Sequence, residues 1–351
     1  MKKVTVIGNG ALSLSVAARM ADRGAAVTFV DVVGKEEPRS PTVLHVAGLE
    51  NYDAVFAAVT HGYDSVPDAD LVVITATGSH HAKIFRETVP LIRNGQTVLF
   101  FPACFGAINF LAQIRDRGID VTVAEAVSFV CVCEMQGADT LCIQNLKNSM
   151  RLAVKPTERT EETIEALNRY FEIFTPARNF LETSLDNMNM TLHPLPLLLN
   201  ISAAERDTQS FRHYIDGISP TVGRIMEQLD AERMRIGETF GLQLTRAYDQ
   251  LVEYYGERNL PSLAEYASSE EGPYPAVKGY GLDSRYIVED IPYLLVAAAA
   301  LGKSCGVQTP VMDLCIALAS MISARDYTQE GYSLKRMGLE GLSCEEILQR
   351  V

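Results

Sequence analysis

The sequence has few basic residues for its acidic content, with 31 Lys and Arg against 44 Asp and Glu and a formal net charge of −13. A surface this acidic repels nucleic-acid phosphates and anionic lipid, so we expect neither nucleic acid nor a membrane as a partner. An anionic small substrate would need a local basic side chain in its site. The shares of hydrophobic (47%) and charged (21%) residues exclude disordered, collagenous and coiled-coil classes.

Membrane and secretory signals are also lacking. The longest apolar run of the C-terminal half, residues 293–301, is far shorter than the ~20 residues that a membrane span requires. The N-terminus enters an apolar strand directly, without the apolar core or the cleavage site of a signal peptide. We therefore expect a cytoplasmic protein.

Metal-ligand spacing is absent as well. The seven cysteines are odd in number and scattered, and we interpret them as buried thiols in a reducing compartment. Cys131 and Cys133 share one face of a predicted strand, but no second Cys or His pair stands nearby at ligand spacing. We expect no metal site.

The length of 351 residues favours two domains, and the first half reads as a parallel α/β domain. Short, continuously apolar strands alternate with helical patterns, which indicates a sheet buried on both faces. A change of pattern at residues 140–154 predicts an antiparallel hairpin between residues 141–143 and 151–154. The predicted strands before it are residues 4–7, 27–30, 71–75, 97–101 and 121–124, with a helix at residues 11–23.

The second half has almost no strand signal after residue 181. Ser219-Pro220 and Thr309-Pro310 each predict a helix start, with the hydroxyl residue as N-cap and proline at the first helical position. A further helix is predicted at residues 293–302. We place the domain division after residue 178, so that residues 1–178 form the α/β domain and residues 179–351 an all-helical domain. The stretch 239–255 has two possible uses, as core or as the face of a homodimer.

A glycine-rich turn follows the first predicted strand. Gly8 and Gly10 permit a tight turn and a close approach of backbone to a pyrophosphate, next to Ala11, and Ser13 is small enough for helix and strand to pack closely. The turn is followed by Asp31 at the end of the second strand, where a carboxylate binds the adenosine ribose hydroxyls and repels a 2′-phosphate. This pattern predicts an N-terminal Rossmann domain with a mostly parallel, doubly wound sheet, which binds NAD in preference to NADP.

Other residues fall at the same sheet edge. Thr77 and Pro102 follow two of the predicted strands, at the carboxyl ends where ligands bind in such folds, and we expect them to contact the cofactor. Arg39 is a residue that would favour NADP instead. His80 and His81 begin a predicted helix near this edge, and we expect solvent-facing or capping roles for them.

Lysine is absent between Lys155 and Lys278, which removes the proton donor that many two-domain reductases use. His193, flanked by apolar residues just after the domain division, is then the leading acid/base candidate and is expected to face the nicotinamide. Its competitor His213 lies in a polar stretch, which favours a surface position. Arg285 and Asp290 precede an apolar helix, where charges are unfavourable unless they are paired or used.

Three separated segments resemble the octopine/nopaline dehydrogenase family. They are Thr183-Ser184-Leu185-Asp186-Asn187 through His193-Pro194, residues 214–233, and Arg285-Tyr286 with Glu289-Asp290-Ile291-Pro292. The resemblance covers nearly the whole chain, although Ser13 replaces a glycine or alanine and Cys133-Glu134-Met135 stands where a basic residue is expected.

The resemblance implies reductive condensation of an amino acid with a 2-keto acid such as pyruvate, and the reverse oxidation. It implies that His193 and Asp290 form the catalytic pair and that Arg285 and Asn187 bind substrate. Two alternatives stay open from the sequence. One is a simple 2-keto acid or 2-hydroxy acid oxidoreductase in the same fold, and the other is a non-catalytic NAD-binding sensor.

Overall fold

The computed structural model describes residues 2–33, 40–206, 210–279 and 281–351. The chain divides into two compact units, Met1–Thr183 (unit 1) and Ser184–Val351 (unit 2). The predicted division after residue 178 therefore falls inside unit 1, just before helix α5 (Phe180–Leu185). Within the described ranges, no helix is both long and apolar enough to cross a bilayer.

Unit 1 contains an eight-stranded sheet in the order β12-β11-β8-β7-β6-β1-β2-β5. All neighbours are parallel except β11, which runs antiparallel to β8, so the sheet is the mostly parallel Rossmann sheet that the sequence predicted. Its strands are β1 (Lys3–Gly8), β2 (Ala26–Asp31), β5 (Ala58–Thr60), β6 (Leu71–Ile74), β7 (Thr97–Phe100), β8 (Thr122–Ala126), β11 (Met150–Lys155) and β12 (Phe174–Pro176).

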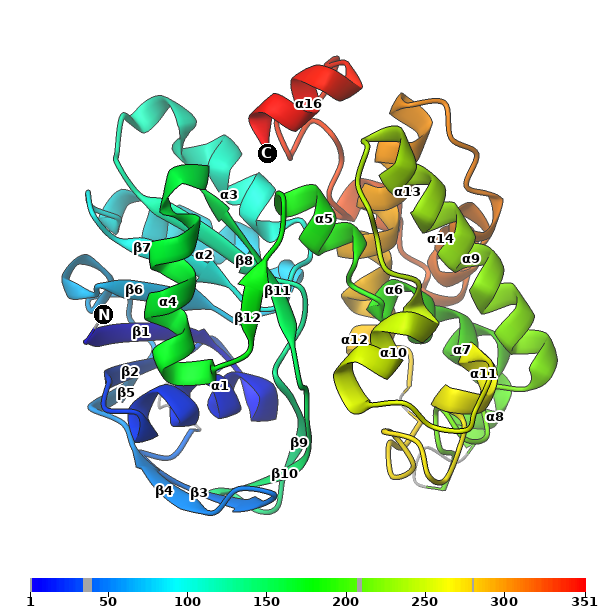
Figure 1. Ribbon diagram of the computed structural model, residues 1–351, viewed down its shortest axis with the longest axis horizontal. Helices are drawn as coiled ribbons and strands as arrows, with labels where there is room; N and C mark the ends of the chain where they lie inside the picture. The colour runs from blue at the N-terminus through cyan, green and yellow to red at the C-terminus, as the bar shows by residue number, and fades with distance from the viewer. Residues whose placement is uncertain (1, 34–39, 207–209, 280) are drawn as a thin grey trace. The chain divides into compact units, whose positions relative to one another are not determined.

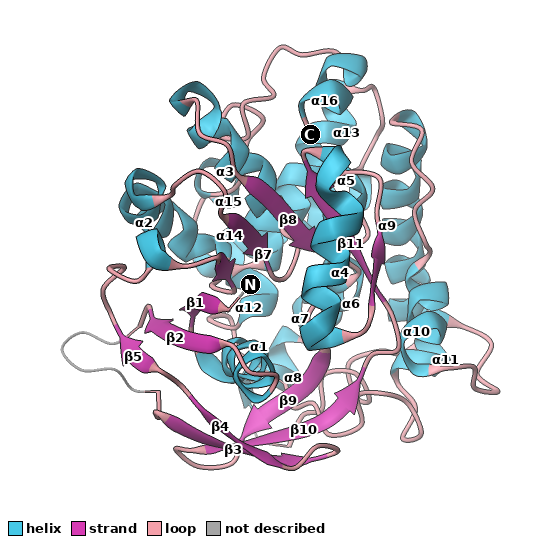
Figure 2. Cartoon of the chain, turned by 60° about the vertical axis from the view of Figure 1, so that its left-hand side comes forward, coloured by secondary structure: helices cyan, strands magenta, loops and turns pink. Residues whose placement is uncertain are grey.

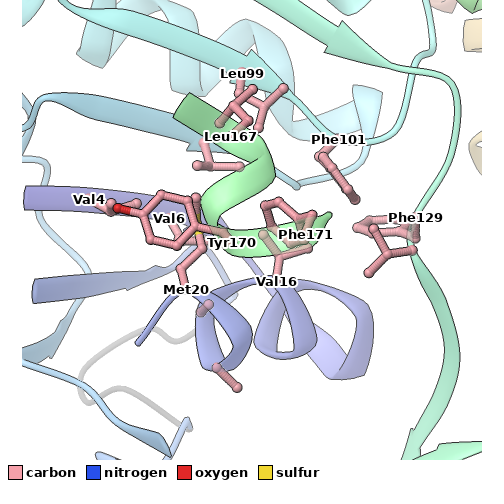
Figure 3. Packing of buried hydrophobic residues seen from close by; sticks show 14 of the residues in the cluster. Val4, Val6, Val16, Met20, Leu99, Phe101, Phe129, Leu167, Tyr170 and Phe171 are labelled. Carbon is pink, nitrogen blue, oxygen red and sulfur yellow. The ribbon is translucent and has the colours of Figure 1, made fainter. Parts of the chain in front are cut away.

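Helices cover both faces of this sheet because successive strand residues point to opposite sides. On one face, Leu99 and Phe101 join a core with α1 (Gly10–Asp22) and α4 (Thr160–Phe171), which Figure 3 shows from close by. On the other face, the ring of Phe100 packs against rings of α2 (Gly78–Thr88) and α3 (Gly106–Ile114). All these strand side chains are buried, which accounts for their continuous apolarity.

A second, four-stranded sheet in unit 1 has the order β4-β3-β10-β9. Helix α1 lies between this sheet and the strands of the main sheet (Figure 2). The predicted hairpin of residues 141–143 and 151–154 is wrong, because β10 pairs with β9 and β3 whereas β11 joins the main sheet. The strands are β3 (Val43–Gly48), β4 (Tyr52–Val55), β9 (Cys131–Met135) and β10 (Thr140–Leu146).

The described part of unit 2 contains helices and no strand, as predicted. Helices α9, α13 and α14 pack against one another (Figure 1). The helices are α6 (Asn189–Leu192), α7 (Pro194–Leu199), α8 (Ile201–Arg206), α9 (Pro220–Thr239), α10 (Ala247–Tyr255), α11 (Leu263–Ala267), α12 (Arg285–Val288), α13 (Val296–Ser304), α14 (Pro310–Ser323), α15 (Tyr327–Glu330) and α16 (Cys344–Arg350), with a π-helix at Ile291–Leu295.

The two predicted N-caps have different outcomes. Ser219 accepts the N–H of Val222 and caps α9, as predicted. Thr309 does not cap α14 through its side chain. The carboxylate of Glu232 on α9 does so instead, because its two oxygens accept the N–H groups of Val311 and Met312 at 2.7 and 3.0 Å. A cap supplied from another helix leaves no local signal in the sequence.

The prediction that all the cysteines are buried free thiols is wrong. Cys305 and Cys344 form a disulfide across a sequence separation of 39 residues, joining the end of α13 to the start of α16. Cys133 and Cys142 are free but only partly buried. Pairing depends on which cysteines the fold brings together, and spacing does not reveal it. The disulfide removes the basis on which the thiols indicated a reducing compartment.

Candidate functional site

The glycine turn of unit 1 has the geometry that a dinucleotide requires. A Cβ on Gly8 would lie 2.0 Å from Thr75 Oγ1 and 2.4 Å from Ser13 Oγ, so only glycine fits there. Gly10 has φ +74°, and a Cβ there would meet no atom of the described residues within 4 Å. Space is therefore open at the N-terminus of α1, where backbone N–H groups and the helix dipole favour a phosphate.

Ser13 takes the place of the third glycine without disturbing the turn. Its buried hydroxyl accepts the N–H of Asn9 at 3.0 Å and donates to the Asn9 carbonyl at 2.8 Å. The side chain thus closes the turn on itself. Ala11, the next residue after Gly10, lies in the first turn of α1 and is half-buried.

Asp31 stands beside Gly8, its register partner across β1 and β2. It is 4% exposed, and its carboxylate accepts the N–H of Val33 and the hydroxyl of Ser40, each at 3.1 Å. These bonds fix the carboxylate at the carboxyl end of β2, where the ribose of a dinucleotide binds in this fold. Arg39 lies outside the described residues.

Thr77 and Pro102 lie at the same sheet edge as Gly8, because Ile7 pairs with Ile74 and Ile74 with Phe100. Thr77 is the N-cap residue of α2, and its hydroxyl lies 2.9 Å from His80 Nδ1. Pro102 is half-buried and follows a cis peptide bond. These residues fit a dinucleotide site on the carboxyl edge of the sheet.

The expectation for His81 is wrong. It is 3% exposed rather than solvent-facing, and its Nε2 donates to the carbonyl of Ala76 at 3.0 Å. Burial lowers the pKa of His81 to about 4, so the ring is neutral at pH 7. His80 is half-buried, and its pKa is lowered by burial and then by the charge of Lys83.

Unit 2 joins His193 and Asp290, which are 97 residues apart in sequence. His193 Nδ1 lies 2.7 Å from Asp290 Oδ2, and the two side chains are 8% and 1% exposed. Since a carboxylate only accepts, Nδ1 carries the proton and Nε2 is the other nitrogen of a fixed tautomer. The second oxygen, Asp290 Oδ1, is buried and has no hydrogen-bond partner within the described part of the chain.

Four short helical segments position this pair. His193 lies between α6 and α7, with Pro194 at the first position of α7. Asp290 lies between α12 and the π-helix Ile291–Leu295, and α12 packs against α7. π-helical turns recur at functional sites, where they redirect side chains.

Aromatic rings surround His193. The ring of Tyr286 stacks on it with centroids 3.9 Å apart and planes 23° apart. The rings of His213 and Tyr214 lie 6.2 and 6.4 Å from it. His213 is fully buried, so its predicted surface position is wrong. The polar residues beside His213 in the sequence favoured a surface position, and no clear signal in the sequence indicates that its ring is buried beside His193.

Arg285 lies on α12, half-buried, at the start of the segment that carries Tyr286 and Asp290. Its charge acts on Tyr214, whose pKa burial raises well above the usual value while the Arg285 guanidinium lowers it. Arg285 is therefore within electrostatic range of the ring cluster. A guanidinium there can bind a carboxylate with two parallel hydrogen bonds.

Asn187 is buried at the entrance to α6, where its Oδ1 accepts the N–H of Asn189 at 3.1 Å. The preceding residue, Asp186, is held by a fully buried arginine: Arg233 Nη1 lies 2.7 Å from Asp186 Oδ1, and Nη2 lies 2.7 Å from Asp230 Oδ1. This ion cluster accounts for Asp186, Asp230 and Arg233 in the two segments that resemble the family. It anchors the chain just before Asn187 and α6.

Comparison with known proteins agrees with this picture. The family model of the NAD/NADP octopine/nopaline dehydrogenase alpha-helical domain matches residues 176–323. The chain is 32% identical over 290 residues to an opine dehydrogenase of Arthrobacter sp. (strain 1C), covering 82% of this chain and 80% of that protein.

The chain belongs to the octopine/nopaline dehydrogenase family. It is an NAD(P)-dependent dehydrogenase of the opine class. Two solved structures share the fold at low identity. Octopine dehydrogenase with NADH and L-arginine matches with a TM-score of 0.78 and 16% identity over 99% of this chain and 98% of that one. Yersinopine dehydrogenase with NADP+ matches with a TM-score of 0.73 and 13% identity over 100% and 97%.

Proposed function

We propose that the protein catalyses the NADH-dependent reductive condensation of an amino acid with a 2-keto acid such as pyruvate, and the reverse oxidation. The buried His193–Asp290 pair, at 2.7 Å, carries this proposal, because it supplies a fixed acid/base in a family member. The choice of substrates follows octopine dehydrogenase, which was solved with L-arginine and with pyruvate. The amine and the keto acid first lose water to form an imine.

The His193–Asp290 pair would carry out the proton transfers of the reaction. Asp290 accepts from His193 Nδ1, which orients the ring and stabilises its positive form. Nε2 then gives a proton to the departing oxygen of the keto acid or takes one from the reacting amine. The chemistry that NADH supplies when bound is a hydride for the imine carbon.

Two residues of unit 2 would bind substrate. Arg285 is proposed to hold a carboxylate, since the acidic protein needs a local cation to attract an anion. Asn187, which the resemblance implies as a substrate contact, is buried just before α6, where its Oδ1 accepts the N–H of Asn189. Positioning two substrates is a large part of the rate gain in such a reaction.

In unit 1, Gly8, Gly10, Ala11 and Ser13 are proposed to form the phosphate-binding turn, with Thr77 and Pro102 at the same edge. Asp31 would bind the ribose hydroxyls and repel a 2′-phosphate, which supports NAD over NADP. The stretch proposed for core or dimer contacts buries Leu251 and Tyr254 in unit 2, which supports the core use.

The test is the rate of NADH consumption with pyruvate or 2-oxoglutarate, alone and then with each of the common amino acids. Consumption that requires both substrates is the expected result, and the best pair is repeated with NADPH. Consumption with the keto acid alone would replace the proposal with a hydroxy-acid dehydrogenase. Tight NADH binding without consumption by any pair would favour a non-catalytic sensor.

A further inference from the structure

His213 is a second buried imidazole beside His193, and its backbone is held on two sides. Its N–H donates to the carbonyl of Val277 at 3.0 Å. A Cβ on Gly217 would lie 2.2 Å from the His213 carbonyl oxygen, so the following turn closes tightly over it. The ring itself is fully buried. His213 therefore occupies a fixed place in unit 2.

The ring of His213 is neutral in the physiological range. Burial, and then the charge that His193 can carry, lower the pKa of His213 to about 3. Nε2 lies 3.2 Å from the Leu192 carbonyl and must donate to it, which leaves Nδ1 as the acceptor. Nδ1 has no hydrogen-bond partner among the residues that the structure describes. A phenylalanine would avoid this unsatisfied nitrogen, so stability alone does not account for an imidazole here.

Two contacts connect His213 to His193. The Leu192 carbonyl that accepts from His213 belongs to the peptide unit that joins Leu192 to His193. The ring of Tyr286 lies 4.5 Å from the His213 ring and 3.9 Å from the His193 ring. The hydrogen bond thus restrains the backbone of His193, and the shared tyrosine restrains its ring.

We infer that His213 is a positioning residue, which fixes the direction in which His193 presents its proton-exchanging nitrogen. The inference rests on the acid/base role proposed for His193. Asp290 holds the imidazole at Nδ1, and a hydrogen bond at that one atom fixes the tilt of the ring less firmly than it fixes the position of Nδ1. The hydrogen bond from His213 to the Leu192 carbonyl and the stacked Tyr286 ring add further restraints on the tilt. Small errors in the position of a catalytic group reduce rates strongly.

Two variants separate the hydrogen bond from the packing. His213→Phe keeps an aromatic ring and removes the donor to the Leu192 carbonyl, and we expect kcat to fall about 10- to 100-fold. The KM of both substrates and the Kd of NADH should stay as in the wild type, because His213 touches neither in this account. His213→Gln, whose amide N–H reaches a similar place, should recover part of kcat.

The matched control is Tyr266→Phe. Tyr266 is also fully buried in unit 2, and its hydroxyl donates to the Gly256 carbonyl at 2.6 Å. The Tyr266→Phe variant loses a comparable hydrogen bond to a backbone carbonyl, and its kcat should equal that of the wild type. A wild-type kcat in folded His213→Phe would overturn the inference, as would a fall in kcat of equal size in Tyr266→Phe.

A readout independent of turnover keeps this test separate from that of the proposed function. NMR of protein labelled with 15N-histidine should show shifted or broadened His193 ring signals in His213→Phe and His213→Gln, with the larger change in His213→Phe, and unchanged ones in Tyr266→Phe. Unchanged His193 signals in both His213 variants would overturn the inference even if no substrate pair is active. If His213→Phe does not fold, His213→Gln decides by the same spectra.

Discussion

The glycine turn of unit 1 and the His193 cluster of unit 2 differ in how far apart along the chain their parts lie. Gly8, Gly10 and Ser13 lie within one strand–turn–helix, and Asp31 ends the next strand. The cluster instead joins His193 to Asp290 across 97 residues. The turn is specified by local backbone geometry, whereas the cluster depends on the packing of several helices.

The two sites should therefore respond differently to substitutions. A turn is disturbed by adding a single carbon atom at a glycine, with effects confined to that place. The cluster is held by neighbours that never touch a substrate in our account, among them Arg233 and Tyr286. Its function should therefore respond to substitutions of these supporting residues as well as to substitutions of His193 and Asp290.

The largest effect is expected at the catalytic pair. Asp290→Asn keeps the shape of the side chain but removes the charge that fixes the His193 tautomer, and kcat should fall on the order of 10³- to 10⁴-fold. The Kd of NADH should not change, since Asp290 lies in unit 2 and the glycine turn in unit 1. Steady-state kinetics and NADH titration measure both. The control is Asp283→Asn, an exposed carboxylate on the same segment; a kcat of Asp290→Asn within about tenfold of the wild type would contradict the assigned role.

The next largest effect is expected at the ion cluster of Arg233, Asp186 and Asp230. Arg233→Ala leaves Asp186 and Asp230 as buried carboxylates without their cation, and unfolding free energy should fall by about 3–5 kcal/mol. Arg235→Ala, an exposed arginine on the same helix, is the matched control and should change little. Urea denaturation followed by circular dichroism gives both values. Equal losses of unfolding free energy in the two variants would show that the ion cluster does not stabilise unit 2.

Each unit carries a buried histidine whose pKa is lowered by burial, His81 in unit 1 and His213 in unit 2, so acid should reduce the stability of both units. Below pH 6.5 the unfolded chain binds protons that the folded chain resists, until pH reaches the folded pKa of about 4 for His81 and about 3 for His213. The contribution of each ring to the free energy of unfolding is thus fully present above pH 6.5. It falls by about 1.4 kcal/mol per pH unit below that, which amounts to a loss on the order of 3 kcal/mol for each ring by pH 4.

His81→Phe should remove one of these two slopes and leave the other. Denaturation curves at pH 7, 6 and 5 for the wild type and this variant measure the difference. A variant with the full pH dependence of the wild type would show that folding does not lower the pKa of His81.

The smallest effect is expected at the glycine turn of unit 1. Gly10→Ala and Gly24→Ala both place a Cβ at a positive φ, +74° and +89°, with no atom within 4 Å in the part of the chain that the structure describes. Each should destabilise the fold by about 1–2 kcal/mol. Only Gly10→Ala should also weaken NADH binding, by about tenfold or more, because its Cβ enters the path of the pyrophosphate. Equal NADH affinity of the two variants would place the cofactor elsewhere.

The same contrast explains how much the sequence could predict. Strands β1, β2, β6, β7 and β8 and helix α1 were predictable because their apolar runs are continuous and their turns are local. The second sheet was missed, because β3 and β4 are short strands with one exposed face that carries polar residues such as His45 and Asp53. Its partner strand β10 lies far along the chain, so hydrophobic pattern did not mark the pairing.

For the candidate site, residue types were predictable and surroundings were not. His193, Asp290 and Arg285 were proposed from their chemistry and from the resemblance, and the structure brings His193 and Asp290 together. The burial of His213 and the stacking of Tyr286 were not, since both depend on contacts between segments about 70 to 90 residues apart in sequence. The same holds for the cap that Glu232 supplies to α14 and for the disulfide.

The most direct test of the central claim is the mass of the product formed from 15N-labelled amino acid, a 2-keto acid and NADH that carries deuterium on the transferred position. The proposed reaction predicts one product that contains both the 15N atom and one deuterium, with a carbon–nitrogen bond between the two substrates. Deuterium found only in a 2-hydroxy acid, with the labelled amino acid unchanged, would contradict it.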